Sequence, residues 1–398
     1  MSQASSSRTV PPRGSLRDLF PVRTIARLGV AWAMVAAFVL GGHEWLRDPI
    51  AAPAAVVCFV VLFATILLSS FGVVREADHL AHALGEPYGT LILTLSIVSI
   101  EVILIAAVMT GPGDTPTIGR DSIFAVMMII LNLVIGACLV AGGWRHGAQE
   151  YNAQGAAAYM SMILILTVTA LALPNVTGTG DGSFLPAQAI AISVLTVLVY
   201  AGFLALQMGS YRRFFVQPEA GSMTVPARRP AGIPPRDRDA GNPSPRDRRA
   251  IVVRSIVLIA LILPIVLLAH YLAVLIDLGV EHAGMPAAVG GVLIAMIVFT
   301  PESITAVRAA LADQMQRTVN LCLGAFVSTV GLTVPAVLTI GLVAGKTVTL
   351  GLTAADGVLM VMTIALSALT FAGQRTSPVQ GMMHLMLFAV YGVFLLMP

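Results

Sequence analysis

The chain alternates between long apolar runs and short polar connections. A membrane-spanning helix needs roughly 20 consecutive, mostly apolar residues, and such runs recur along the whole chain. This pattern predicts an all-α polytopic membrane protein. We predict about eleven transmembrane helices, at residues 28–43, 50–74, 87–110, 121–143, 155–174, 184–209, 251–276, 285–307, 319–343, 349–371 and 378–397.

The composition supports the same class. Of the 398 residues, 57% are hydrophobic and 11% are charged, and the mean hydropathy is +0.89. A soluble chain carries about 25% charged residues. An ordinary soluble domain is therefore excluded, and the lipid bilayer is expected to surround most of the chain.

Polar segments divide the chain into five parts. Residues 1–27 form a polar, arginine-bearing tail, and residues 28–49 contain an extra N-terminal transmembrane helix and its outer loop. Two larger units, 50–210 and 251–398, hold five predicted spans each. The segment between them, 211–250, is rich in Pro, Gly and Arg without apolar periodicity. We predict that it is a basic, disordered linker.

The distribution of Lys and Arg predicts the orientation, because cytoplasmic loops carry an excess of basic residues. With a cytoplasmic N-terminus, the tail, the linker and the other connections on that side hold 20 of the 23 basic residues. Arg47, Arg120 and Lys346 fall on the other side. We expect a multi-pass protein of the cell inner (plasma) membrane, with the tail and linker in the cytoplasm and the C-terminus outside.

The two five-span units resemble each other. In each unit the second span carries a lone glutamate, Glu101 or Glu302, and the third opens with a matching string, Asn132-Leu-Val-Ile-Gly136 or Asn320-Leu-Cys-Leu-Gly324. An odd number of spans per unit forces the second copy to insert upside down. Inverted repeats of this kind are typical of secondary transporters, which bind substrates at the repeat interface near the midplane.

Glu101 and Glu302 lie in the middle of apolar spans, where a charge costs about 3 kcal/mol and usually faces a cavity or a partner. A single such residue is compatible with a protonated, structural glutamate that hydrogen-bonds a neighbouring helix. Two at equivalent positions of inverted repeats favour a shared site. Ionised carboxylates side by side repel each other, and a divalent cation or two protons would relieve the repulsion.

The pair therefore predicts a secondary active antiporter that exchanges a cation for protons. Glu101 and Glu302 would bind the metal cation and the protons, and the neutral loaded forms would cross between access states more easily than the empty dianion. Inorganic cations, protons and lipid are the expected partners, nucleic acid is not, and no resident cofactor is expected.

Calcium takes six to eight oxygen ligands, more than two carboxylates supply. Pro301 is expected to break its helix and free carbonyl oxygens at that depth. Each neighbouring hydroxyl has an alternative role, a bond to its own i−4 carbonyl. The supporting polar candidates are Thr94, Ser99, Asn132, Thr300, Ser303, Asn320, Ser328 and Thr329.

Two segments resemble the signature repeats of the calcium/cation antiporter superfamily. They are LGEPYGTLILTLSIVSIEV at 84–102 and TPESITAVRAALADQMQRTVNLCLGAFVSTVGLTVPAV at 300–337. The residues that match the signature spacing are Gly85, Glu86, Gly89, Glu101, Glu302, Asn320 and Gly324.

More narrowly, the chain is similar to the bacterial calcium/proton antiporters of the ChaA type, in the calcium/proton exchanger family. The resemblance covers essentially the whole chain. It implies an eleven-helix exchanger that exports Ca²⁺ for protons by alternating access, with Glu101 and Glu302 as the ion- and proton-binding carboxylates.

The chain departs from the family pattern beside both glutamates. Many members have Asn three residues before each repeat glutamate, where this chain has Val98 and Phe299. Fewer hard oxygen ligands predict that Na⁺ or K⁺ competes with Ca²⁺. A monovalent cation/proton antiporter with little calcium transport is therefore the alternative. The linker is often acidic in relatives and is basic here.

Two other classes are weaker alternatives. GPGD at 111–114 matches the G-x-G-D pattern of intramembrane aspartyl proteases, but Asp114 falls in a short loop and has no second mid-span aspartate to pair with. H-E-x-x-H is absent, so we do not expect an enzyme. A channel could also use a ring of carboxylates, but an inverted repeat favours a carrier.

Overall fold

The computed structural model describes residues 22–46, 50, 52–84, 88–111, 115–177, 180–218, 245–373 and 375–397. In these residues the chain is helical, apart from turns, loops and two isolated β-bridges. Several helices begin at a local signal. Proline opens α8 and α14, and the Asn152 side chain caps α7 by accepting from two backbone N–H groups.

The first half of the chain contains six spans. The first of them, α2, lies outside the repeat. Within the repeat, the third span combines α5, a π-helical segment η1 and α6, and the fourth combines α7, the π-helical η2 and a short 3₁₀ turn, η3. The elements are α2 (Val22–Trp45), α3 (Ala52–Leu84), α4 (Tyr88–Met109), α5 (Ile118–Met127), η1 (Met128–Val134), α6 (Ile135–His146), α7 (Ala153–Thr167), η2 (Val168–Ala172), η3 (Leu173–Asn175) and α8 (Pro186–Met208).

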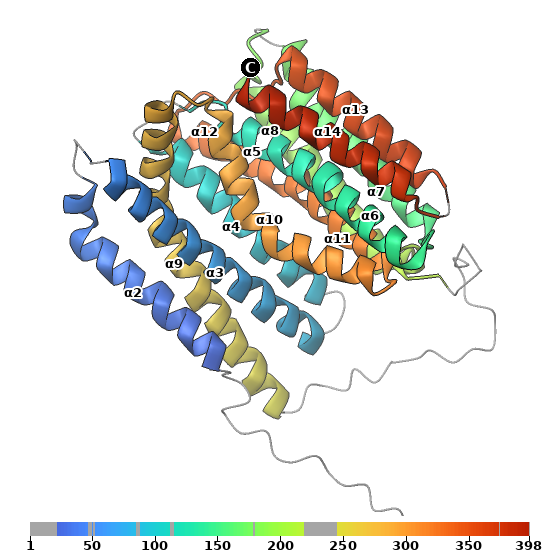
Figure 1. Cartoon of the computed structure of the whole chain (residues 1–398), viewed down its shortest axis with the longest axis horizontal. Helices are drawn as coiled ribbons and strands as arrows, with labels where there is room; N and C mark the ends of the chain where they lie inside the picture. The colour runs from blue at the N-terminus through green and yellow to red at the C-terminus, as the bar shows by residue number, and fades with distance from the viewer. Residues whose placement is uncertain are drawn as a thin grey trace, which may run out of the picture.

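The second half contains five spans, and its third span is again interrupted by a π-helical segment, η5. Its elements are α9 (Pro245–Ala283), α10 (Ala288–Leu311), α11 (Met315–Ser328), η5 (Thr329–Thr333), α12 (Val334–Ala344), α13 (Ala354–Phe371) and α14 (Pro378–Leu396). Figure 1 shows all these helices gathered in one bundle.

Ten described helical stretches are long and apolar enough to cross a bilayer, and α4 adds a shorter apolar stretch, Thr94–Met109. The prediction of about eleven transmembrane helices is confirmed. The first span of each repeat, α3 or α9, is longer than predicted. α3 continues past its apolar part through charged residues such as Glu76, and α9 begins before its apolar part with charged residues such as Arg249.

The ends of the predicted linker are ordered, so the boundaries 211–250 were too wide. A 3₁₀ turn, η4 (Arg212–Phe215), follows α8, and α9 begins at Pro245. Aromatic packing explains the first end, since Phe215 lies 5.1 Å from Tyr159 between ring centroids. Residues 219–244 lie outside the described part of the chain. We call the membrane face where α8 ends and α9 begins the linker face, and the other the opposite face.

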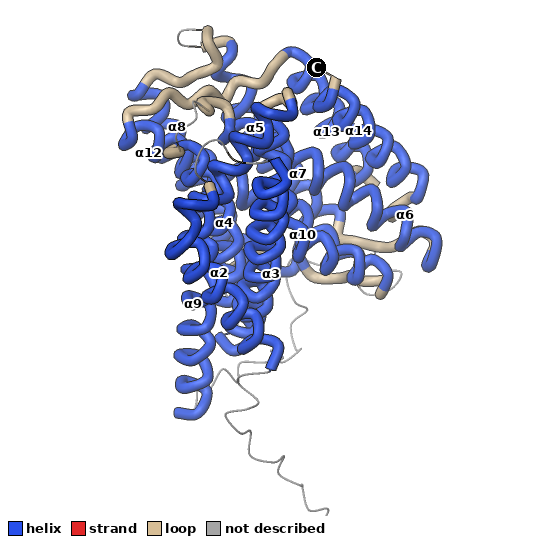
Figure 2. Tube along the Cα trace, turned by 60° about the vertical axis from the view of Figure 1, so that its left-hand side comes forward, coloured by secondary structure: helices blue, strands red, loops and turns tan. Residues whose placement is uncertain are grey.

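The helix contacts follow an inverted two-fold symmetry. α3 packs along α9, its equivalent in the other repeat. α3 also contacts α10 while α9 contacts α4, and α8 contacts α12 while α14 contacts α6. Each pair becomes the other when the repeats are exchanged. The fold is therefore two inverted five-helix repeats plus the extra helix α2, which lies beside α3 and α9 along one edge (Figures 1 and 2).

Two isolated antiparallel β-bridges show the same symmetry at the two faces. On the linker face, Glu150 before α7 pairs with Arg375 before α14; on the opposite face, Thr349 before α13 pairs with Ser183 before α8. Each bridge joins the loop after the third span of one repeat to the loop after the fourth span of the other. The repeats are thus fastened together at both ends of the bundle.

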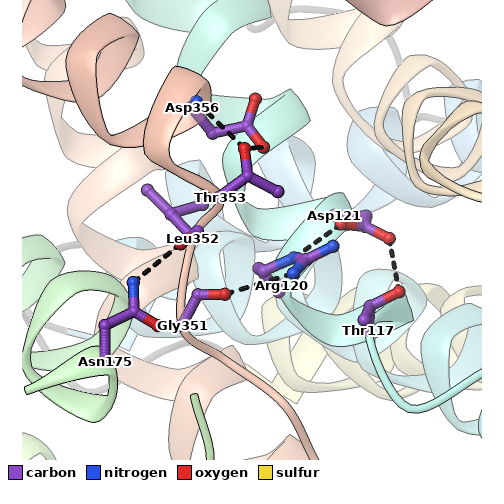
Figure 3. Close-up of polar contacts among 8 residues, drawn as sticks. All are labelled: Thr117, Arg120, Asp121, Asn175, Gly351, Leu352, Thr353 and Asp356. Carbon is purple, nitrogen blue, oxygen red and sulfur yellow. Dashed lines mark hydrogen bonds and ion pairs between the residues drawn. The ribbon is translucent and has the colours of Figure 1, made fainter. Parts of the chain in front are cut away.

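We call the contacts of residues 345–353 the opposite-face clasp (Figure 3). The Thr349 N–H donates to the Pro116 carbonyl, and Arg120 donates to the Gly351 carbonyl at 3.1 Å while pairing with the Asp121 carboxylate at 2.8 Å. The Asn175 amide donates to the Leu352 carbonyl at 2.7 Å. The clasp brings together α5 and loops from both repeats.

The linker-face clasp is formed by residues 147–152. The Gln149 amide donates to the Ala310 carbonyl at 2.9 Å and to the Asp313 carboxylate at 2.8 Å. The Asn152 N–H donates to Gln316 Oε1. These bonds join the first repeat to the loop between α10 and α11, and so fix the start of α11.

Candidate functional site

Glu101 lies in the middle of α4 and is fully buried, with 0% of its surface exposed. Its Oε2 accepts a hydrogen bond of 3.1 Å from the Thr329 hydroxyl, at the start of η5 in the other repeat. Thr333, four residues further along η5, also lies beside the carboxylate. The sequence distance between Glu101 and Thr329 is 228 residues, so the inverted packing alone brings them together.

Glu302 lies in α10 and is 8% exposed. It is close enough to Glu101 for the two charges to interact. Within the described residues, Glu101 Oε1 and Glu302 Oε2 have no hydrogen-bond partner. Buried oxygens without a donor are costly, and a cation or a proton on each carboxylate would satisfy them.

A cavity of about 290 Å³ leads to Glu302. One wall is a face of α8 with residues spaced three or four apart, from Tyr200 to Met208; the other is the corresponding face of α11, from Arg317 to Ser328. Thr94 and Ile97 of α4 complete it at depth, and η4 contributes near the linker face. The cavity therefore connects the linker-face end of α11 with the level of the two carboxylates.

Four of the predicted supporting residues and one signature glycine lie at these two places. Thr94, Asn320, Gly324 and Ser328 line the cavity with Glu302, and Thr329 bonds Glu101. A Cβ added at Gly324 would lie 3.3 Å from the Tyr159 hydroxyl, so this glycine keeps the cavity open beside the tyrosine.

Three predicted hydroxyls are not brought to the carboxylates. Ser99 is exposed and donates to the Leu95 carbonyl. Thr300 and Ser303 line a separate, mostly apolar groove and donate to the carbonyls of Met296 and Phe299. All three make the i−4 backbone bond that is the ordinary alternative for a helical hydroxyl.

Asn132 and Asn320 do not occupy equivalent places, although their strings match. Asn132 lies inside η1, where its amide donates to Thr363 at 3.0 Å and its carbonyl oxygen lies 3.1 Å from His384 Nδ1. Asn320 lies near the start of α11, where it donates to the Phe215 carbonyl at 2.7 Å. Asn132 is the fifth residue of η1, and the fifth residue of η5 is Thr333. The string match was wrong because short apolar strings recur by chance.

Of the remaining signature residues, some lie in the described part of the chain and others do not. Gly85 and Glu86 lie outside the described residues, and Gly89 lies in the first turn of α4. Pro301 does not break α10, which runs unbroken from Ala288 to Leu311. Because proline lacks an N–H, the Ile297 carbonyl still loses its helical donor. The irregular backbone expected at Pro301 occurs in the π-helical segments η1 and η5 of the third spans.

Several polar groups near the site were not predicted. Thr333 lies beside Glu101, and the Tyr200 hydroxyl lies near Thr94 and Ser328. The Gln207 amide donates to the Tyr159 hydroxyl at 2.7 Å on the cavity wall. In the sequence, each of these residues is a polar group inside an apolar span, which is the same feature that marked the glutamates.

Val98 and Phe299, which replace amides of the family pattern, are buried beside the glutamates, with 5% and 1% exposure. They add no oxygen ligands. Among the described residues there is no group of three or more His, Cys, Asp or Glu side chains that could hold a metal. The oxygens around the carboxylates come mainly from hydroxyls.

Asp114, the residue on which the protease alternative depended, lies outside the described residues.

A carboxylate pair between inverted repeats, reached by a cavity from one face, defines a secondary transporter. The family model for the sodium/calcium exchanger protein matches residues 54–209 and 254–397. The chain belongs to this family, within the calcium/cation antiporter superfamily, and the resemblance found in the sequence is confirmed. It is a multi-pass membrane transporter and not an enzyme.

Two relatives match over most of their length. The chain is 33% identical over 342 residues to the putative ionic transporter y4hA of Sinorhizobium fredii (strain NBRC 101917 / NGR234), covering 85% of this chain and 89% of that protein. It is 32% identical over 360 residues to the sodium-potassium/proton antiporter ChaA of Escherichia coli (strain K12), covering 90% and 92%.

The fold is also that of a solved antiporter structure. The crystal structure of the Ca²⁺/H⁺ antiporter protein YfkE superimposes with a TM-score of 0.67 at 17% identity, covering 94% of this chain and 100% of that one. At this identity the likeness concerns the arrangement of the helices.

Proposed function

We propose that the protein is a cation/proton antiporter in which Glu101 and Glu302 form one site, occupied in turn by a cation and by protons. The observation that carries this proposal is the pair of buried carboxylates, one from each inverted repeat, each with an oxygen lacking a hydrogen-bond partner in the described structure. The name of the relative from Escherichia coli, a proton-coupled antiporter, supports the same class.

The exchange follows from charge. With both carboxylates ionised and the site empty, two negative charges face each other in a medium that solvates them poorly. One divalent cation, two monovalent cations or two protons neutralise both carboxylates. Only the neutral forms pass readily from one access state to the other, so a cation leaving by one face is replaced by protons from the other.

We propose that the site accepts Ca²⁺ and also Na⁺ or K⁺, with export from the linker face. Apart from the carboxylates, its oxygens come from Thr94, Ser328, Thr329 and Thr333, while Val98 and Phe299 contribute none. Such a ligand set is sparse for Ca²⁺, which takes six to eight oxygens. The family description and the sodium-potassium name of a relative agree with a mixed preference.

Glutamine substitutions test the coupled site. Glu101→Gln keeps the volume and removes one charge and one protonatable group, so neither the cation-loaded nor the two-proton form can assemble. We expect loss of exchange in Glu101→Gln and in Glu302→Gln, with the double variant no worse than either, because the residues act as a unit. The measurement is proton flux from everted vesicles after addition of Ca²⁺, Na⁺ or K⁺, at matched protein levels.

Glu281→Gln is the matched control, because Glu281 is an exposed glutamate near the end of α9 and its variant should keep normal flux. A structural glutamate that is permanently protonated predicts the opposite result, since glutamine mimics the neutral acid. Near-normal exchange in either site variant would remove that residue from the site. Flux driven by Na⁺ or K⁺ but not by Ca²⁺ would favour the monovalent antiporter over the mixed one.

A further inference from the structure

Two arginines line the outer part of the cavity that leads to Glu302. Arg317 stands at the start of α11, on the helical face that continues through Asn320 and Gly324 to Ser328. Eleven residues separate Arg317 from Ser328, which is about 16 Å along a helix. Arg212 of η4 lines the same cavity and comes from the other half of the chain. A cation that enters from the linker face passes both before it reaches the carboxylate.

The charge of Arg317 is not cancelled by the contact it makes. The group is exposed and donates to the side chain of Gln314, a neutral amide, at 3.4 Å. Neither Asp313 nor Glu150, the acidic side chains of the neighbouring loops, lines the cavity; Asp313 accepts from Gln149, and Glu150 pairs with Arg375. Glu302 is the acidic residue among the lining residues. The outer cavity is therefore positive and its floor negative.

A positive potential discriminates between cations by their charge. The energy of an ion in a given potential is proportional to its charge, so a divalent ion is opposed twice as strongly as a monovalent one. If the potential lowers the entry rate or the affinity of a monovalent ion by a given factor, it lowers that of a divalent ion by the square of this factor. A cavity with low-dielectric walls focuses such a field. At ~13 Å and an effective dielectric near ~60, one charge changes the local concentration of a monovalent ion about 2-fold and of a divalent ion about 4-fold.

We propose that Arg317 sets the ion preference of the exchanger by holding a positive potential over the outer cavity, which disfavours divalent cations relative to monovalent ones. The inference rests on the proposed antiport function and adds to it the residues that tune selectivity at a distance from the carboxylates. The number of oxygen ligands at the carboxylates is one cause of ion preference, and the positive charge of the outer cavity would be a second.

The test compares Arg317→Gln with the unmodified protein, reconstituted in liposomes, at cation concentrations below saturation. Cation is added on the linker face, and initial proton flux is measured for Ca²⁺ and for Na⁺ or K⁺. We expect Na⁺ or K⁺ flux to rise about 2-fold and Ca²⁺ flux about 4-fold in low salt. Both gains should shrink with rising ionic strength, because the Debye length falls from about 10 Å at 0.1 M to about 3 Å at 1 M.

Two controls separate this role from a structural one. Arg317→Lys keeps the charge and should keep the original ratio of Ca²⁺ flux to Na⁺ or K⁺ flux. Arg308→Gln removes an exposed arginine near the same face that lines the separate apolar groove, and the ratio should not change. Equal changes for both ions in Arg317→Gln, no change in either, or a changed ratio in Arg308→Gln would overturn the inference. In each of these results exchange itself persists, so they are distinct from failure of the antiport proposal, in which the unmodified protein shows no flux.

Discussion

Thr329 brings a hydroxyl of the second repeat to the carboxylate of the first. Its hydroxyl donates to Glu101 Oε2 and thereby stabilises the ionised carboxylate, which is the form that would bind a cation in the proposed site. It belongs to η5, whose π-helical geometry widens the turn locally. A hydroxyl of the second repeat thus stabilises the ionised form of a carboxylate of the first.

Thr329→Val should weaken the apparent cation affinity about 10-fold, because a hydrogen bond to a charged group is worth about 1.5–3 kcal/mol. Valine has the shape of threonine and lacks the hydroxyl, so protons would compete more effectively for Glu101. The measurement is the cation concentration that gives half-maximal proton flux at fixed pH.

Thr339→Val is the matched control for that experiment. The Thr339 hydroxyl donates to the Pro335 carbonyl within α12, away from the carboxylates, and its loss should leave the affinity unchanged. An unaltered affinity in Thr329→Val would show that the hydroxyl is not part of the working site.

At the level of single residues, the sequence pointed to the two glutamates of the proposed site and missed much of their surroundings. A charge in an apolar run is visible without a structure, because the bilayer makes it costly. Whether Ser99 or Thr329 faces the carboxylate depends on helix rotation and on the other repeat. α4 is apolar on all sides, so its sequence does not show which face of the helix is turned towards the other repeat. Thr333 and Tyr200 are visible as polar groups in apolar spans, but the sequence does not show that they face the site.

At the level of elements, hydropathy predicted the spans because length and apolar content are local properties. It could not predict η1 and η5, because a π-helical turn is selected by what packs against it. Pro301 was expected to break α10, but neighbouring helices keep the rest of that helix intact, as membrane packing commonly allows. Asn132 and Asn320 were matched as equivalent positions of the two repeats, but a similarity of five residues is too short to align two helices.

The opposite-face clasp makes a prediction at this scale. A Cβ at Gly351 would lie 1.9 Å from Asn175 Oδ1 and 2.7 Å from Gly182 Cα, so Gly351→Ala must displace backbone. We expect it to lower stability by about 1–3 kcal/mol, measured as a lower midpoint of thermal unfolding in detergent.

Gly357→Ala serves as the comparison for the clasp. Gly357 lies in α13 with nothing within 4 Å of an added Cβ, and alanine favours a helix over glycine by up to about 1 kcal/mol. Its midpoint should stay the same or rise. If Gly351→Ala were equally harmless, the two loops would not be held together as described.

At the level of the whole molecule, an odd number of spans separates the end of α8 from the C-terminus. The basic residues predict that the linker face is cytoplasmic. Single cysteines at Ser210, after α8, and at Met397, after α14, both exposed, should be labelled from opposite sides of the membrane. The background should lack the three natural cysteines, and a membrane-impermeant thiol reagent gives the readout. Labelling of both positions from one side would contradict the predicted topology.

The bond between Glu101 and Thr329 also has a consequence for biosynthesis. Its partners are 228 residues apart, and at about 5–20 residues per second the ribosome needs about 10–45 seconds to travel from one to the other. During that time the first repeat has entered the bilayer with its carboxyl group but without the hydroxyl that will bond it. The nascent half must keep Glu101 neutral or in contact with water until the third span of the second repeat arrives. Assembly of the proposed ion site is therefore a late event, completed only when nearly the whole chain has been made.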